Sequence, residues 1–429
     1  MWLDVLKNDN SLFHFHVEMT SKCNAACPYC PRYKLGEPSR NASINLSELS
    51  IEKVEKLIPV DIIQKIGTIN FCGNFGDPLV CKDAYEIVRY FHINNPKIQI
   101  EVRTNGGARS TDLWSKFGEL SKNSNGKLEV VFSIDGLEDT NDLYRRNVKW
   151  GKLIENVRAF TDNGGIAKWE FLVFRHNEHQ IEDARTLSQE LNFKQILFKR
   201  PYGFEDYFNK KTKPIPVYTK AGDLDYLLEP AKQFSNSDLP YDGEIDGVPL
   251  KIDTSNNSCN LIPQPINYAK YKKEEKYDIK CQAIHNTGNI EVYINANADV
   301  RPCCHLGVEL DRNQQGSIGK QLKHLFSPPT KFNLAVNTLE TILGYFDDII
   351  ENNWDKTHEE GRCMKCSMNC GSPTQTNTNR LYVKEVYHEE EPEEIEEISE
   401  STPLPIEEIV DSKPTEPELL EPKSEITII

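Results

Sequence analysis

The 429-residue sequence has no apolar run near the roughly 20 residues that a membrane-spanning helix needs, so no membrane partner is expected. Its first residues, Met1–Asn10, lack the basic start and the continuous apolar stretch of a secretion signal. We therefore expect a soluble, cytoplasmic protein. The length predicts two or three structural units, and the apolar content suffices for a sizeable core.

A basic excess is also missing. The formal net charge is −16, but residues 383–429 carry 16 acidic residues and 3 lysines, which leaves −3 for residues 1–382. Because residues 1–382 are nearly neutral, they have no overall positive charge that would attract the phosphate backbone of a nucleic acid. Nucleic acid is therefore not expected as a partner. Residues 384–429 are Glu/Pro-rich and almost free of aromatics, which predicts a disordered acidic tail; a docking tail is the alternative.

In the first expected domain, residues 1–200, short β-branched or aromatic segments alternate with amphipathic ones from residue 12 onward, which predicts parallel strands joined by right-handed helical crossovers. We expect an α/β fold, a partial (β/α)6 TIM-like barrel, with a doubly wound sheet as the alternative. In both folds, ligands bind at the carboxyl ends of the strands. The expected strands are Phe13–Met19, Thr68–Gly73, Ile98–Thr104, Leu128–Ile134, Trp169–Phe174 and Gln195–Lys199. The expected helices are Leu46–Lys65, Ala84–Asn94, Asp112–Leu120, Lys152–Asp162 and Glu178–Leu191.

Two further regions precede the tail. Residues 201–280 have poor periodicity and predict an insertion or linking segment. Residues 281–383 hold six cysteines and little regular pattern, so a metal is expected to organise that domain.

The sequence has twelve cysteines, nine of them in three tight groups, a pattern that favours metal or iron–sulfur centres over disulfides in a reducing compartment. Cys72, Cys81 and Cys259 stand apart and are expected to be small buried residues. Cys23, Cys27 and Cys30 form a C-x3-C-x2-C loop after the first strand. Three thiolates on a 4Fe–4S cube leave one iron without a protein ligand, whereas an electron-transfer cluster normally has four cysteines. Zinc is the alternative, but it would need a fourth ligand.

This loop, with Tyr29 before its last cysteine, resembles the signature of the radical S-adenosylmethionine (SAM) superfamily. The resemblance covers about residues 12–200. It implies a 4Fe–4S cluster on the three cysteines and SAM at the open iron. Cleavage of SAM would then give a 5′-deoxyadenosyl radical that takes hydrogen from a substrate.

Three later motifs follow successive predicted strands and strengthen the resemblance. The stretch Gly73–Leu79 resembles the family's glycine-rich loop at the SAM amino group, although the family usually has Glu where this chain has Asp77. Thr104–Gly107 resembles a turn at the barrel rim. Ser133 and Asp135 match positions near the SAM ribose or carboxylate, which Arg145 or Arg146 would pair with. The implied SAM contacts are Gly73, Asn74, Gly76, Asp77, Asn105, Ser133, Asp135 and Arg146.

The C-terminal cysteines are similar to the SPASM or shorter twitch extensions of radical SAM enzymes, with Val300–Cys303 as the closest element. Ala298 stands where the SPASM pattern has glycine, and the spacing of the later cysteines differs. One auxiliary 4Fe–4S cluster is therefore expected rather than two. Its implied ligands are Cys281, Cys303, Cys363 and Cys366, with Cys304 and Cys370 as substitutes or extra ligands; a zinc knot is the alternative.

The resemblance predicts an oxidoreductase or maturase-like enzyme. A peptide, a protein or a small metabolite would be the substrate, and flavodoxin or ferredoxin the electron donor. Two rival classes remain open. A non-catalytic iron–sulfur carrier or scaffold would bind a cluster without cleaving SAM, and a zinc-stabilised binding module would be colourless.

Overall fold

The computed structural model describes residues 2–7, 12–34, 36–201, 204–206, 211–212, 214–232, 244–245, 248–249, 251–252, 278–279, 281, 283, 290–312, 316–372 and 381–386. These residues lie in one compact unit, Met1–His388. The acidic tail lies outside the described residues from 387 onward, and so does Cys259. Within the described part of the chain, no helix is both long and apolar enough to cross a bilayer.

One ten-stranded sheet dominates the fold, in the order β13-β18-β6-β5-β4-β3-β2-β1-β15-β16. Its six central strands are mutually parallel and follow one another in chain order. Every crossover therefore steps in the same direction, which fits a partial barrel; a doubly wound sheet would reverse direction. The strands are β1 (Phe13–Val17), β2 (Ile66–Phe71), β3 (Gln99–Thr104), β4 (Leu128–Ser133), β5 (Ile166–Leu172) and β6 (Phe193–Lys199). The predicted fold class is confirmed.

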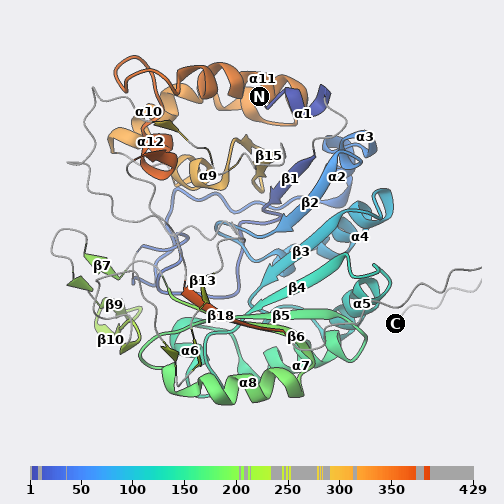
Figure 1. The fold of residues 1–429 in the computed structure, drawn as a ribbon, viewed down its shortest axis with the longest axis vertical. Coiled ribbons are helices and arrows are strands. Elements are labelled where there is room, and N and C mark those ends of the chain that lie inside the picture. Colours follow the sequence, from blue (N-terminus) through green and yellow to red (C-terminus); the bar gives the residue numbers. More distant parts are fainter. Residues whose placement is uncertain are drawn as a thin grey trace, which may run out of the picture. The chain divides into compact units, whose positions relative to one another are not determined.

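Helices cover the convex face of this curved sheet, as Figure 1 shows. Their aromatic side chains form the core: the Trp114 ring lies 5.2 Å from that of Phe132 on β4 and 6.0 Å from that of Phe160 on α7. The helices are α2 (Ile51–Leu57), α3 (Val60–Ile63), α4 (Ala84–Asn94), α5 (Thr111–Lys122), α6 (Asn141–Tyr144), α7 (Trp150–Thr161) and α8 (Ile181–Glu190).

The single helix predicted over Leu46–Lys65 is wrong. Residues 46–50 form no helix, and the rest is divided into α2 and α3 by Pro59, which is the N-cap of α3. Proline has no N–H to donate and its ring clashes with the preceding turn, so the helix ends before it.

Segments from the C-terminal half complete both edges of the sheet. Strand β15 (Ile290–Ile294) pairs parallel to β1, and β16 (Val300–Arg301) pairs antiparallel to β15. At the other edge, β18 (Leu381–Val386) pairs antiparallel to β6 and carries β13 (Lys251–Ile252). Lys384–Val386, which we had placed in the tail, thus belong to a strand, because β6 offers an unpaired edge.

Four helices lie on the side of β15: α9 (Cys304–Asp311), α10 (Ser317–Leu325), α11 (Leu339–Ile349) and α12 (Met364–Cys370). Residues 281–383 therefore contain regular helices although their sequence shows little regular pattern. Thr338 caps α11, and Ile342 and Phe346 on that helix are buried at helical spacing, a signal present in the sequence.

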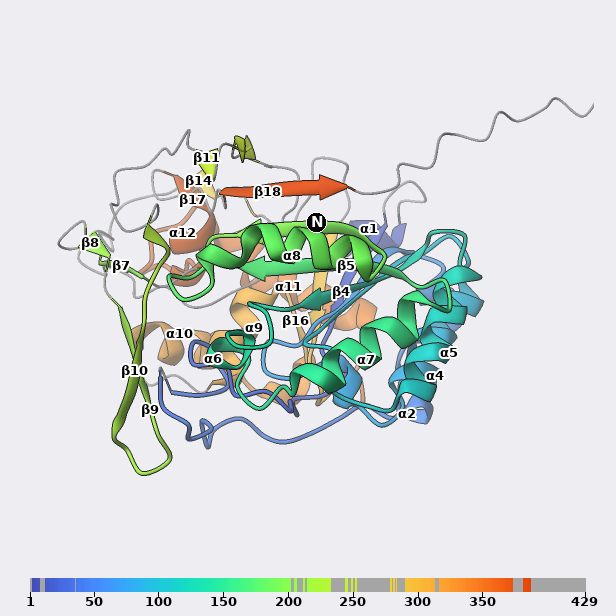
Figure 2. The ribbon, with the colours of Figure 1, turned by 90° about the horizontal axis from the view of Figure 1, so that it is seen from below.

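Part of the 201–280 segment forms a hairpin, β9 (Ile215–Tyr218) with β10 (Leu224–Leu228), which projects from the unit in Figure 2. The remaining short elements are α1 (Asp4–Lys7), β7 (Glu205–Asp206), β8 (Lys211–Thr212), β11 (Glu244–Ile245), β12 (Val248–Pro249), β14 (Asp278–Ile279) and β17 (Gly371–Ser372).

Candidate functional site

The first cysteine group lies in the loop that follows β1, at the carboxyl end of the sheet. Cys23, Cys27 and Cys30 are free thiols; Cys27 is buried, and the other two are half-buried. The loop is held from inside by the Cys30 N–H, which donates to the Cys27 carbonyl at 3.1 Å. Burial raises the pKa of all three thiols, to about 12 for Cys30. A bound metal would offset this by stabilising the thiolates.

Two side chains, one directly after β3 and one at the C-terminal end of α6, donate toward these sulfur atoms. The Asn105 amide nitrogen lies 3.8 Å from the Cys23 Sγ, and the Arg145 Nη1 lies 3.7 Å from the Cys27 Sγ. Donors of this kind suit thiolate ligands, whose charge they stabilise. Three sulfur ligands with two donors beside them fit an iron–sulfur cluster that has one iron free of protein ligands.

The hairpin β9–β10 packs against the same loop. The Tyr218 N–H donates to the Gly36 carbonyl at 2.9 Å, and the Gly36 N–H donates to the Pro28 carbonyl at 2.9 Å. A Cβ at Gly36 would lie 1.8 Å from the Pro216 carbonyl oxygen, so only glycine allows this approach. The hairpin therefore helps to fix the cysteine loop.

The glycine-rich loop Gly73–Leu79 follows β2 and passes directly beside the chain that leads into the cysteines. The Asp77 N–H donates to the Lys22 carbonyl at 2.9 Å. A Cβ on Gly76 would lie 1.6 Å from the Thr20 carbonyl oxygen, and one on Gly73 would lie 2.3 Å from the Gly76 carbonyl oxygen. Both glycines are thus required by close backbone packing, whether or not they also contact a ligand.

Glu18 is a buried residue that sequence reasoning missed. Its carboxylate accepts hydrogen bonds from the N–H groups of Phe75 at 2.7 Å and Gly76 at 2.9 Å, and from the Tyr293 hydroxyl at 2.8 Å. It therefore joins β1, the glycine-rich loop and β15. The available signal was an acidic residue in an apolar strand, five positions before Cys23.

The pH dependence of the protein's stability should reflect the ionisation of the Glu18 carboxyl group. Burial raises the pKa of its carboxyl from 4.5 to about 7, so its contribution to stability is present below pH 4.5 and is lost as the pH rises through 7. Between about pH 5 and about pH 8, the wild type should lose up to about 3 kcal/mol of stability relative to Glu18→Gln. Urea unfolding across this range measures the difference. Glu119→Gln, on the exposed surface of α5, is the control, and parallel curves for Glu18→Gln and wild type would contradict the prediction.

The Asp77 carboxylate connects two loops at the rim of the barrel through four hydrogen bonds that it accepts. It accepts hydrogen bonds from the Thr104 hydroxyl at 2.9 Å, from the Asn105 backbone N–H and side-chain amide, both at 2.7 Å, and from the Leu79 N–H at 3.0 Å. The structure thus brings Asp77 and Asn105 together beside Cys23. Asn74 instead reaches the C-terminal half, where its amide donates to the Cys304 carbonyl at 3.3 Å.

Asp135, just after β4, holds Arg145 beside the cysteine loop. Its buried carboxylate accepts from the Arg145 Nε at 2.6 Å and from the Leu172 N–H at 2.6 Å. Ser133 is the last residue of β4 and lies on the same rim.

Arg146, the arginine that we had favoured, points elsewhere. Its Nη2 pairs with Asp225 on the hairpin at 3.0 Å, while its carbonyl accepts from the Ala26 N–H at 2.9 Å. The structure therefore places Arg145, rather than Arg146, at the thiolates.

The C-terminal cysteines also gather in one place. The Cys281 thiol lies close enough to that of Cys370 for the interaction to raise the Cys281 pKa, and the Cys363 and Cys366 thiols also interact with each other. Cys303 is near enough to Cys370 for their charges to interact, and burial raises the Cys303 pKa. Five thiols predicted as ligands or substitute ligands thus converge: Cys281 follows β14, Cys303 is the N-cap of α9, Cys363 directly precedes α12, and Cys366 and Cys370 lie in α12. Beside them, the buried Lys365 ammonium pairs with Glu309 at 2.8 Å.

Comparison with known proteins identifies the part of the chain that carries this site. Residues 17–187 match the Radical SAM superfamily. They form a radical SAM domain, which supports SAM-dependent radical chemistry with a 4Fe–4S cluster and SAM, and confirms the family resemblance. No curated protein matches the sequence.

Solved structures that the chain matches include SuiB of Streptococcus suis, at 12% identity and a TM-score of 0.42, covering 69% of this chain and 61% of SuiB. SuiB bound to its precursor peptide SuiA gives 13% identity and a TM-score of 0.44, covering 81% and 65%. The structure of anSMEcpe with bound AdoMet gives 17% identity and a TM-score of 0.36, covering 46% and 52%. The chain thus spans less than two thirds of the length of each of these proteins.

Proposed function

We propose that this protein is a radical SAM enzyme that activates a peptide, a protein or a small metabolite by removing a hydrogen atom. The observation that carries the proposal is the convergence of three free thiols with the Asn105 and Arg145 donors. A 4Fe–4S cluster held by Cys23, Cys27 and Cys30 would deliver an electron to SAM and so generate the 5′-deoxyadenosyl radical that takes the hydrogen.

The chain's own residues would position these groups and keep water away. Arg145 places a cation beside Cys27, where it would favour the thiolate and could donate hydrogen bonds to the carboxylate of SAM. Asp135 fixes the arginine, while Asp77 and Glu18 fix the loops on either side of Cys23. The remaining proposed SAM contacts are Gly73, Asn74, Gly76, Asn105 and Ser133, while Arg145 replaces Arg146.

We further propose that the C-terminal cysteines hold one auxiliary 4Fe–4S cluster, in a SPASM- or twitch-like extension. The proximity of Cys281, Cys303, Cys363, Cys366 and Cys370 supports it. Four of the five thiols suffice for such a cluster, and they are buried or half-buried, away from bulk solvent.

A polar barrel interior supports a polar substrate. The inward-facing Arg103 on β3 pairs with Glu170 on β5 at 2.5 Å, and Lys199 on β6 pairs with the same carboxylate. Flavodoxin or ferredoxin would serve as the electron donor, and the reaction would take place in the cytoplasm.

Anaerobic reconstitution followed by SAM and dithionite tests the proposed function. We expect 5′-deoxyadenosine from the wild type and none from the Cys23/Cys27/Cys30→Ala variant, because that variant has no ligands for the SAM-binding cluster. Cys81→Ser, outside both cysteine groups, should retain the activity. A fully loaded wild type that cleaves no SAM would instead make the protein an iron–sulfur carrier.

Iron content tests the number of clusters. The wild type should hold about eight irons and the Cys23/Cys27/Cys30→Ala variant about four, if one auxiliary cluster is present. Iron and sulfide analysis of reconstituted protein gives these values. An unchanged iron count in the triple variant would show that the first loop holds no cluster, and a colourless protein with zinc would show that neither group does.

A further inference from the structure

Arg32 is a buried cation that follows Cys30 closely in the first cysteine loop, and its side chain is 6% exposed. Its Nη1 donates to the carbonyl of Ser21, which precedes Cys23. The same nitrogen donates to the carbonyl of Phe75, in the glycine-rich loop, at 3.4 Å. The guanidinium group therefore joins the end of the cysteine loop both to its beginning and to the glycine-rich loop.

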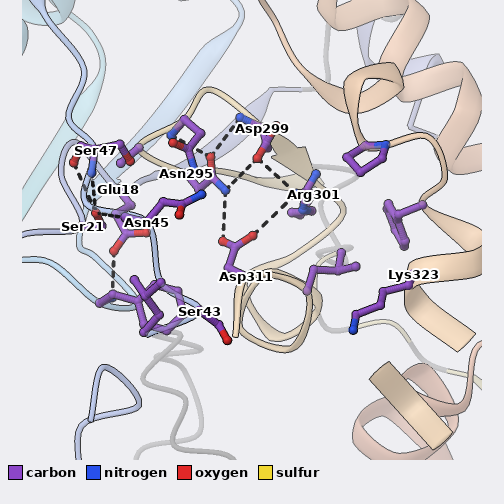
Figure 3. Close-up of a pocket in the computed structure, with 17 residues that line it drawn as sticks. Glu18, Ser21, Ser43, Asn45, Ser47, Asn295, Asp299, Arg301, Asp311 and Lys323 are labelled. Atoms are coloured by element: carbon purple, nitrogen blue, oxygen red, sulfur yellow. Dashed lines mark hydrogen bonds and ion pairs between the residues drawn. The ribbon is translucent and has the colours of Figure 1, made fainter. Parts of the chain in front are cut away.

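The two carbonyl groups that hold Arg32 belong to segments that are themselves fixed. The Ser21 hydroxyl donates to the Asn45 carbonyl at 2.7 Å, as Figure 3 shows, and the Phe75 N–H donates to the Glu18 carboxylate at 2.7 Å. Ser21, Glu18 and Phe75 line a cavity of about 410 Å³. Among the described residues, Arg32 does not line this cavity, so its guanidinium group lies within the interior.

The charge of Arg32 has no carboxylate beside it in the described part of the chain. Its hydrogen-bond acceptors there are neutral carbonyl groups, and its Nε has no partner among these residues. The Tyr33 ring, 5.9 Å from the guanidinium carbon, provides only a weak cation–π contact. Arg145, the other arginine at the cysteine loop, is by contrast paired with Asp135. Because a buried charge without a counter-charge is costly, an anion near Arg32 would stabilise this arrangement.

The Cys30 thiol is close enough to Arg32 for the arginine to affect its ionisation. Burial raises the pKa of Cys30 to about 12, while the backbone N–H and the charge of Arg32 act in the opposite direction and favour the thiolate. Three thiolates outweigh the positive charge of a 4Fe–4S core, so a cluster in this loop would be an anion, and its reduction would add a further negative charge.

We propose that Arg32 is a positioning residue of the first cluster, whose positive charge balances the anionic cluster while its hydrogen bonds tie the cysteine loop to the glycine-rich loop. A nearby cation stabilises the reduced, more negative form of a cluster more than the oxidised form, so Arg32 raises the reduction potential. This role rests on the proposed function, because it requires the first cluster.

A redox titration of the reconstituted full chain without SAM, followed by electron paramagnetic resonance, tests this role. The signal of the first cluster is the one that is absent from the Cys23/Cys27/Cys30→Ala variant. Arg32→Gln keeps a hydrogen-bond donor but removes the charge, and we expect its midpoint potential to fall below that of the wild type. Arg32→Lys keeps the charge and should stay closer to the wild type. A merely structural role would leave the potential unchanged.

Lys34→Gln is the matched control for the loss of charge. Lys34 lies in the same loop and its side chain is 66% exposed, so solvent screens its charge and the potential should stay that of the wild type. Equal potentials in Arg32→Gln and Lys34→Gln, or a fall in Arg32→Lys as large as that in Arg32→Gln, would overturn the role of Arg32.

Failure of this role is distinguishable from failure of the proposed function. A wild type whose first loop binds no cluster would refute the proposed function, whereas a loaded cluster with an unchanged potential in Arg32→Gln refutes only the role of Arg32. If Arg32→Gln takes up no first cluster, Arg32→Lys decides the question. Loading of Arg32→Lys would show that the charge is needed and support the role, and loss of the cluster in both variants would overturn it.

Discussion

Replacing Arg145 by methionine should lower the free energy of unfolding by about 3–5 kcal/mol. The Asp135 side chain is fully buried and pairs with the Arg145 Nε at 2.6 Å, so the variant would leave a carboxylate in the interior without its cation. Urea unfolding of the full chain measures the change. The same variant should also impair the cluster, since Arg145 lies beside the Cys27 sulfur.

The neighbouring arginine provides a matched control for this experiment. Arg146→Met removes an ion pair with Asp225 that is partly open to solvent, so it should cost less than about 1 kcal/mol. Adding Asp135→Asn to Arg145→Met should restore much of the lost stability, because the unpaired charge is then removed. Equal losses for the two arginine variants, or a double variant no better than Arg145→Met, would contradict the role assigned to this pair.

Gly76→Ala should be the most damaging change of a single methyl group, with an expected loss of about 3 kcal/mol. The added Cβ would lie 1.6 Å from the carbonyl oxygen of Thr20 and 2.6 Å from its carbonyl carbon, which are backbone atoms and cannot turn aside. The loop would have to move away from the chain leading to Cys23. It would thereby lose the hydrogen bond from the Gly76 N–H to Glu18.

Gly151→Ala is the corresponding control. It lies in α7, and a Cβ there meets nothing within 4 Å. Alanine should therefore be neutral or stabilise by up to about 1 kcal/mol, through its helix propensity. Unfolding curves and iron content of both variants, prepared in parallel, give the comparison. Similar stability in Gly76→Ala and Gly151→Ala would show that the loop does not pack as described.

Much of the barrel could be predicted because its signals are local. Alternating apolar segments located all six central strands, and the cysteine and glycine loops follow directly from strand ends. Pro59 also carried a local signal, which the apolar pattern of residues 46–65 outweighed in our prediction. The pairing of strand β15 had no local signal, because nothing in the sequence near residues 290–294 indicates that this segment pairs with β1, some 280 positions earlier.

The choice between Arg145 and Arg146 shows the same limit within the site. The two residues are adjacent and identical, so no spacing argument can separate them. Arg145 follows α6 directly, and the fold turns its side chain toward Asp135 and Cys27, while the side chain of Arg146 meets a hairpin about 80 residues later.

The sequence by itself determined the class of chemistry, because three thiols within eight residues and the glycine-rich motif are set by covalent spacing. Only the tertiary structure decided which polar groups support them. It placed Glu18 beside the glycine-rich loop and Arg145 beside the thiols of the first cysteine loop. The physical reason is that hydrogen bonds and ion pairs act over a few ångströms in space, whatever the distance along the chain.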